Sequence, residues 1–204
     1  MASPTKVIVI VIDSADWDLL LKWSDSGDLP VMQSLREKGV WGLLTSPPAM
    51  GDDATWASFY TAVSPARHGR YFWKQIQPGS YTMLQFRDVY LKREPFWNKL
   101  SRAGCRVALV DVSKSPLSTT LNGFQLADWL VHGRDHDTCS WPSDTALDVL
   151  ACFGDDRTDR WGTDEYLCHM DSLSEGEYEI FLKRLLDSVD MKVAVASKFL
   201  ARGD

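Results

Sequence analysis

The longest apolar run of the chain lies near its start. Val7 to Ile12 are six consecutive β-branched residues, which favour a strand over a helix. The run has no polar residue on either face, so it predicts a central strand of a parallel sheet, covered on both sides. It stops at Asp13, and ligands of open α/β sheets bind outside the carboxyl ends of the strands. Asp13 is therefore a candidate metal or phosphate ligand; alternatively, Asp13 or Ser14 caps the next helix.

The rest of the chain alternates between helical and strand periodicity. Helices are predicted where apolar residues recur every three to four positions, and strands where apolar residues are continuous. The predicted helices cover residues 16–23, 30–35, 54–62, 95–103, 143–153 and 175–201. The further predicted strands cover residues 40–44, 106–112 and 126–131, and residues 71–92 suggest short strands outside the main sheet.

Capping and core positions add detail to three of these helices. Asp52 or Asp53 is the predicted N-cap of helix 54–62, and Ser143 is the predicted cap of helix 143–153. A loop with few apolar residues covers 154–162. The core side of the last helix is predicted from spacing to carry Ile180, Phe181, Leu185, Val189, Val193 and Phe199.

Strands that alternate with helices predict an α/β fold: a mostly parallel sheet with helices on both faces. The length of 204 residues suits one domain, with residues 71–94 and 130–175 as possible insertion or cap segments. The chain stops just after a long amphipathic helix, where the next strand of an α/β unit would begin. We therefore expect a fragment, truncated at its C-terminus, of a longer domain.

Composition excludes several classes of function. The net charge of −6, with 25% charged residues of both signs, argues against a nucleic-acid duplex as partner. No apolar run is long enough to span a bilayer, and no signal peptide is visible. The four cysteines have no C-x-x-C spacing, so we expect reduced thiols and a cytoplasmic protein.

A second polar cluster follows the predicted strand 40–44. A loop with two prolines and Gly51 leads into helix 54–62, whose N-terminus can bind phosphate or sulfate through backbone N–H groups. Asp52, Asp53, Thr55 and Ser58 lie at this end of the helix. Ordinary helix capping explains the same residues without any ligand.

Three stretches together resemble a known family. They read V-I-V-I-V-I-D-S-A-D-W-D, then G-D-L-P-V-M-Q-S-L-R-E-K-G-V-W-G-L-L-T-S-P-P, and then A-T-W-A-S-F-Y-T-A-V-S-P-A-R-H-G. In this order they resemble the alkaline phosphatase superfamily, and more closely the type I phosphodiesterase / nucleotide pyrophosphatase family. The resemblance covers Lys6 to about Phe153 and implies an alkaline phosphatase-like core.

The family implies a two-metal hydrolase, usually with zinc, that acts on small-molecule phosphodiesters or related phosphate, sulfate or phosphonate esters. A Thr or Ser at a helix N-terminus attacks phosphorus in line, while two divalent ions clamp the attacking and leaving oxygens. Asp13 matches the first metal-binding aspartate of the family. The residues toward the second metal are absent from this chain, so we expect a phosphodiesterase at full length and little activity from these 204 residues alone.

The nucleophile position departs from the family pattern. Counted back from Trp56, the family's Thr falls on Asp52; counted forward from Pro47 and Pro48, it falls on Met50. Asp52 is therefore a candidate carboxylate nucleophile or metal ligand, and Thr55 is the nearest candidate hydroxyl; Asp53 ranks behind both. If the site is active, Asp52, Asp53 or Thr55 should lie about 4–6 Å from the Asp13 carboxylate.

The histidines do not supply the missing ligands. Asp135 and His136 resemble a D-H motif but lie in a polar loop where a surface pair is expected, and His169 fits a loop or partly buried position. His68 matches the H-G of the family, where it supports the loop after the helix. His132 is a weak candidate for a substrate-cap region.

Other classes fit less well. A haloacid-dehalogenase-like phosphatase needs a second Asp where this chain has Ala15, and no G-x-G-x-x-G follows the first strand. The remaining alternatives are a catalytically inactive family member, kept as a binding or scaffold protein, and an incomplete fragment.

Overall fold

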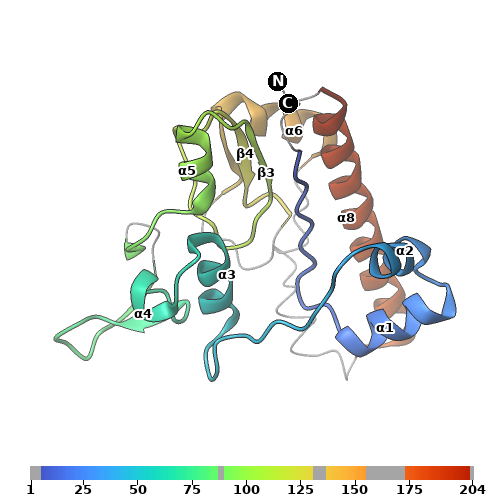
Figure 1. Cartoon of the computed structure of the whole chain (residues 1–204), viewed down its shortest axis with the longest axis horizontal. Coiled ribbons are helices and arrows are strands. Elements are labelled where there is room, and N and C mark those ends of the chain that lie inside the picture. Colours follow the sequence, from blue (N-terminus) through green and yellow to red (C-terminus); the bar gives the residue numbers. More distant parts are fainter. Residues whose placement is uncertain (1–5, 87–89, 131–136, 155–172, 203–204) are drawn as a thin grey trace. The chain divides into compact units, whose positions relative to one another are not determined.

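The computed structural model describes residues 6–86, 90–130, 137–154 and 173–202 (Figure 1). The chain forms two compact units, Met1–Thr45 and Ser46–Asp204, which are described here one after the other. No helix within the described ranges is long and apolar enough to cross a membrane.

The first unit contains two helices, each with a local start signal and a glycine after its end. Helix α1 covers Trp17–Ser26 and ends at Gly27, whose φ of 87° is left-handed. Helix α2 covers Pro30–Lys38, with the proline in its first turn and Gly39 after its end. Both helices run slightly longer than predicted, and their existence and type are confirmed.

The predicted strands at 7–12 and 40–44 are wrong in the structure. Both segments lack strand pairing, and the side chains of Val7 to Ile12 are between 50% and 82% exposed. An apolar run can signal burial, but a strand also needs a neighbour that completes its hydrogen bonds. None of the described residues pairs with either segment.

The second unit holds all of the described strands. Its helices are α3 (Asp52–Thr61), α4 (Pro65–His68), α5 (Phe96–Arg102), α6 (Ser143–Phe153) and α8 (Glu175–Arg202). Its strands are β1 (Lys74–Ile76), β2 (Met83–Gln85), β3 (Val107–Val110), β4 (Gly123–Ala127) and β5 (Cys139–Trp141). The mixed α/β class is confirmed, but the sheets are small.

The described strands form two sheets rather than one mostly parallel sheet. Strands β1 and β2 are an antiparallel pair, which confirms the expectation of short strands apart from the main sheet. The second sheet has the order β3-β4-β5; β3 pairs with β4 in parallel, and β5 pairs with β4 antiparallel. Strand β5 was not predicted, and β4 begins three residues earlier than the predicted strand 126–131.

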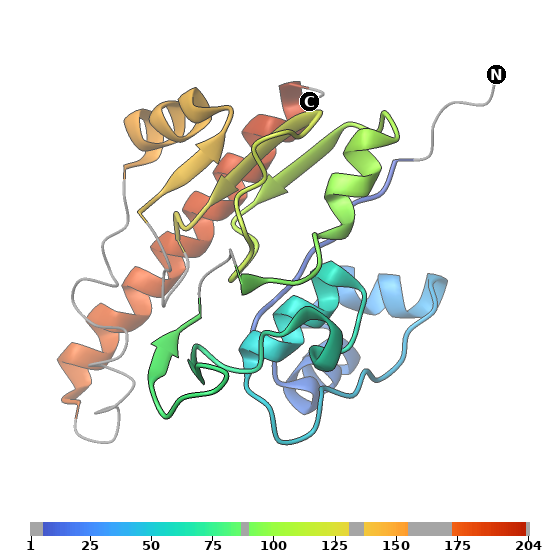
Figure 2. The ribbon, with the colours of Figure 1, turned by 90° about the vertical axis from the view of Figure 1, so that its left-hand side faces the viewer.

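Helices cover both faces of the three-stranded sheet (Figure 2). On one face, Phe124 and Leu126 of β4 pack with Val149 of α6 and Val195 and Phe199 of α8. The other face carries a separate cluster from β3, α3 and α5, formed by Trp56, Ala57, Tyr60, Trp97 and Leu121, with Val107 and Leu109 against them. The two clusters hold α3 and α8 on opposite sides of the sheet.

Gly123 opens β4 at a point of very close contact. Its φ is 139°, and a Cβ there would lie 2.0 Å from the carbonyl oxygen of Val107. Only glycine permits this backbone approach. A residue that weakens strand prediction is thus required by the pairing of β3 with β4.

The predicted core side of α8 is largely wrong. Ile180, Leu185, Val189 and Val193 are 43–59% exposed, whereas Phe199 is buried. The buried side chains of the helix are Val195 and Phe199. Helical spacing showed that α8 has apolar stripes, but it did not show which stripe meets the sheet.

Candidate functional site

The N-terminus of α3 carries two adjacent aspartates in different environments. Gly51 is the N-cap, without a side-chain cap, and Asp52 and Asp53 form the first turn of the helix. The prediction of Asp52 or Asp53 as N-cap was therefore wrong by one residue. The Asp52 side chain is 52% exposed, while that of Asp53 is 2% exposed. Both carboxylates lie at the helix end that favours negative charge.

Asp53 is part of a buried ion pair. Its Oδ1 accepts hydrogen bonds from Arg70 Nε at 2.8 Å and lies 2.7 Å from Arg70 Nη2. The Arg70 side chain is also only 2% exposed. This two-pronged contact connects the first turn of α3 to Arg70, two residues after the end of α4, so Asp53 has a structural partner within the fold.

Lys114 brings a second positive charge to both aspartates. Its Nζ lies 2.7 Å from Asp52 Oδ2 and 3.2 Å from Asp53 Oδ2. The Lys114 side chain is 17% exposed, so the contact with Asp52 lies at the boundary between the interior and solvent. Two carboxylates and two cations thus form a nearly neutral cluster at the start of α3.

The backbone of the loop after β3 holds Lys114 in place. Lys114 has a left-handed φ of 54°, which costs a non-glycine residue about 1–2 kcal/mol. Its carbonyl oxygen accepts hydrogen bonds from Arg70 Nη1 at 3.1 Å and from Tyr60 Oη at 3.0 Å. Buried Gln125 of β4 fixes the next part of the loop. Its Nε2 donates a hydrogen bond to the Pro116 carbonyl oxygen, and its Oε1 accepts one from the Ser118 N–H.

His68 and Ser58 form a close pair that resembles a catalytic dyad. Ser58 Oγ lies 3.1 Å from His68 Nε2, but His68 Nδ1 accepts the backbone N–H of Arg70 at 3.1 Å. In the neutral ring the proton is therefore on Nε2, which donates to Ser58 Oγ. A protonated Nε2 cannot act as the base that removes the proton of the Ser58 hydroxyl. Burial, and next the charge of Arg70, lower the pKa of His68. His68 is thus a neutral residue that anchors the loop after α3, in line with its predicted supporting role.

Thr55 and Asp13 complete the set of predicted site residues. Thr55 is partly buried in α3, one position after the buried Ala54. Asp13 belongs to the first unit, where Asp16 rather than Asp13 or Ser14 caps α1, through Oδ1 and the Leu19 N–H at 2.9 Å. Asp13 is therefore not used as a helix cap, and its predicted proximity to Asp52, Asp53 or Thr55 stays a prediction.

A metal cluster is not formed within the parts of the chain that the structure describes. No three histidine, cysteine, aspartate or glutamate side chains come together there in a way that could hold an ion. Asp135, His136, His169 and His132, which the sequence did not favour as ligands, lie outside the described residues. Cys105 and Cys152 are free thiols.

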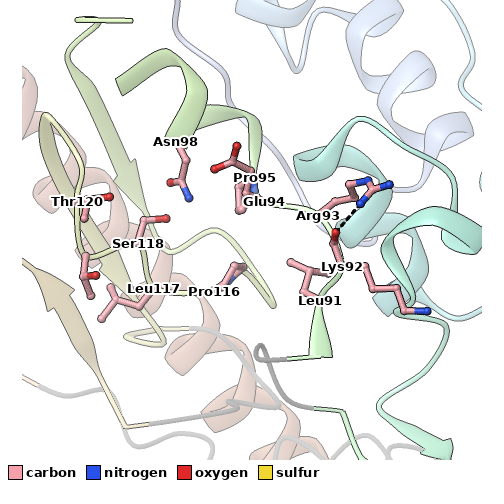
Figure 3. A pocket seen from close by; sticks show the side chains of 11 residues that line it. Leu91, Lys92, Arg93, Glu94, Pro95, Asn98, Pro116, Leu117, Ser118 and Thr120 are labelled. Atoms are coloured by element: carbon pink, nitrogen blue, oxygen red, sulfur yellow. Dashed lines mark hydrogen bonds between the residues drawn. The ribbon is translucent and has the colours of Figure 1, made fainter. Parts of the chain in front are cut away.

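A cavity of about 360 Å³ lies between residues 91–98 and 116–120 (Figure 3). The side chains of Asn98 and Ser118 point toward each other across it, whereas Lys92 and Arg93 extend away from them. Glu94 on its rim is paired with Arg102. The cavity therefore offers no focused positive charge, and the start of α3 is the better place for an anion.

Sequence reasoning missed Lys114 and Arg70. Lys114 is the first charged residue after the predicted strand 106–112. The rule that selected Asp13, a polar group just beyond the carboxyl end of a strand, would have selected Lys114 as well. Arg70 directly follows the H-G motif, but nothing local showed that it reaches Asp53.

Comparison with known proteins identifies a family. The family model described as type I phosphodiesterase / nucleotide pyrophosphatase matches residues 7–147, more than half of the 204 residues. No curated protein and no solved structure matches the chain.

Proposed function

This chain belongs to the type I phosphodiesterase / nucleotide pyrophosphatase family, and on that premise we propose that it acts in the hydrolysis of phosphodiesters or related phosphate, sulfate or phosphonate esters. The family match over residues 7–147 carries the proposal. The helix N-terminus with Asp52 and Lys114 supports it, because this end of α3 combines an accessible carboxylate with a positive charge.

We assign the anionic group of the substrate to the first turn of α3. Its oxygens are stabilised there by the helix dipole and by the Lys114 ammonium, which turns from Asp52 to the substrate. Asp53 is bound by Arg70 and is not available for this task. Asp52 is exposed and stands where the count back from Trp56 places the family's nucleophile, so we assign it as the group that meets the phosphorus atom.

The proposed chemistry passes through an aspartyl-phosphate. A carboxylate oxygen of Asp52 forms a bond to phosphorus in line with the departing ester oxygen, whose bond to phosphorus breaks. The alkoxide takes a proton from water and leaves as the alcohol. A second water then hydrolyses the acyl phosphate and restores the Asp52 carboxylate. In the alternative, the Thr55 hydroxyl loses its proton to solvent and its oxygen forms the bond to phosphorus as the bond to the ester oxygen breaks; water then hydrolyses the phosphothreonine and restores the hydroxyl.

Asp13 and Asp52 are the residues that this chain would offer to the two divalent ions, usually zinc, that the resemblance implies. Around α3 the observed donors do not fit an ion: Asp52 Oδ2 is bound by Lys114, and Asp52 Oδ1 accepts the N–H of Asp53. Arg70 and Lys114 already balance both carboxylates. The steps proposed above therefore use only side chains, water and substrate, and metal binding by Asp13 is a separate proposal.

The test is single-turnover hydrolysis of bis(p-nitrophenyl) phosphate by the purified 204-residue chain, for which a low rate is expected. Asp52→Asn should lower the rate about a thousandfold or more. Asp144→Asn is the matched control, since Asp144 also lies in the first turn of a helix, α6. An acyl phosphate trapped by hydroxylamine would support Asp52. Loss of activity in Thr55→Val, with Asp52→Asn still active, would transfer the role to Thr55.

The second candidate is an inactive family member that binds phosphoesters without turnover. The ion pair between Lys114 and Asp52 favours it, because a carboxylate stands where the family has a hydroxyl and is already neutralised. Calorimetric titration with phosphate separates the two candidates. Binding that Lys114→Met abolishes, together with no hydrolysis by the wild-type chain, would favour binding without turnover for these 204 residues.

A further inference from the structure

Helix α8 has a second apolar stripe that does not face the core. The stripe consists of Leu182, Leu186, Val189, Val193, Ala196 and Leu200. Five of these side chains are 46–64% exposed, and Ala196 is partly buried. At 100° per residue, the stripe points roughly 120° away from Val195 and Phe199, which contact the sheet.

The spacing of this stripe identifies the kind of partner it fits. Successive members are separated by four, three, four, three and four residues, the repeat of the seam in a coiled coil. A helix that packs on a sheet or a broad core presents a wider stripe, whereas a narrow seam with this repeat fits another helix. The seam extends over 19 residues, from Leu182 to Leu200, or about 27 Å of helix.

Charges beside the seam match a second copy of the same helix. In an antiparallel pair, Leu186 packs against Val189 of the other copy, and Leu182 packs against Val193. This register places Lys183 beside Asp190 of the other copy, and two-fold symmetry repeats the contact. Lys183 is 79% exposed, and its contact with Asp187 in the same helix is long, at 3.7 Å. In a parallel pair in register, Lys183 and Asp190 are not neighbours.

We propose that the chain forms a homodimer through antiparallel pairing of α8 with α8 of a second copy. The interface buries the seam from Leu182 to Val193 on each helix. Two Lys183–Asp190 ion pairs flank it and set the direction of the helices. The stripe that packs on the sheet remains in the core of each copy.

The first test is the mass of the 204-residue chain by sedimentation equilibrium over a dilution series. We expect a mass near twice 23.0 kDa at high concentration, falling on dilution. Val189→Glu should raise the dissociation constant about a hundredfold, because the symmetric dimer loses two buried valines. The control is Leu147→Glu, an exposed apolar residue of α6, which should leave the dissociation constant unchanged. Both sites are exposed, so the thermal melting of the monomer reports that each variant folds.

The second test reads the direction of the pair. Lys183→Asp and Asp190→Lys should each weaken the dimer several-fold, and the double variant should restore it. A chain that stays monomeric at every concentration overturns the proposal, as does an unchanged dissociation constant in Val189→Glu. A dimer that the double charge exchange does not restore overturns the antiparallel register.

Discussion

Replacement of Arg70 by methionine tests whether the α3 cluster is held together by its buried ion pair. Arg70 Nε and Nη2 both lie within 2.8 Å of Asp53 Oδ1, and both side chains are 2% exposed. Arg70 Nη1 also donates to the carbonyl oxygen of Lys114 at 3.1 Å. Methionine fills a similar volume but leaves the Asp53 carboxylate in the interior without its main partner.

The magnitude follows from burial. Removal of one partner from a buried ion pair costs about 3–5 kcal/mol, because the other charge stays buried. Lys114 remains 3.2 Å from Asp53 Oδ2 and compensates in part, so we expect about 3 kcal/mol for Arg70→Met at the lower end of that range. For a chain of this size, the melting temperature should fall by about 6–12 °C.

The assay is urea and thermal unfolding, which compare the loss of stability in Arg70→Met with that in a matched surface variant. Arg102→Met removes an equally close, two-pronged pair with Glu94, but those side chains are 60% and 38% exposed. It should cost much less stability than Arg70→Met, because an exposed ion pair is screened by solvent. The double variant Arg70→Met with Asp53→Leu should regain most of the lost stability, because no buried charge is left. Equal losses for Arg70→Met and Arg102→Met would refute the reasoning.

Three further predictions concern other parts of the chain. Burial, and next the charge of Arg70, lower the pKa of His68, so its contribution to stability is full above about pH 6.5 and is lost as the pH falls toward the folded-state pKa. In urea titrations, His68→Gln should therefore reduce the pH dependence of the free energy of unfolding between about pH 5 and pH 7. An unchanged pH dependence would contradict this. Gly123→Ala should lower the free energy of unfolding by about 3 kcal/mol or more, because its Cβ would meet Val107 O, whereas Gly104→Ala, with open space at its Cβ, is the milder control. Asp13→Ala should lower zinc content measured by atomic emission, and equal content in both proteins would remove Asp13 as a ligand.

Helices were predicted well because their signals are local. Asp16, Pro30, Gly27 and Gly39 mark starts and ends within one turn of the residues that they affect. Helix α6 has the predicted bounds, although Pro142 rather than Ser143 stands at its N-cap. Such signals act whether or not the rest of the chain has folded.

Strands were predicted less well because pairing is not local. The most apolar segment, Val7 to Ile12, forms no strand in the structure, while β5 at Cys139–Trp141 is a strand with a serine at its centre. Strand β5 exists because its backbone completes the hydrogen bonds of β4. Glycine is a poor strand former, yet β4 begins at Gly123 because the Val107 carbonyl oxygen of β3 leaves no room for a Cβ there. This requirement comes from a residue 16 positions earlier in the chain, so it is not local.

The choice between two neighbouring aspartates marks the limit of sequence reasoning at the site. Asp52 and Asp53 are chemically identical and adjacent, and both lie at a helix N-terminus. They differ in the partners that the fold brings to them. Arg70, 17 residues further along the chain than Asp53, binds Asp53, and Lys114, a further 44 residues on, contacts both. Asp53 is buried in an ion pair with Arg70, whereas Asp52 is exposed. Asp52 is therefore the carboxylate that a substrate can reach. Lys114 Nζ contacts both carboxylates. The same ammonium group therefore helps to neutralise buried Asp53 and lies next to Asp52, the proposed nucleophile.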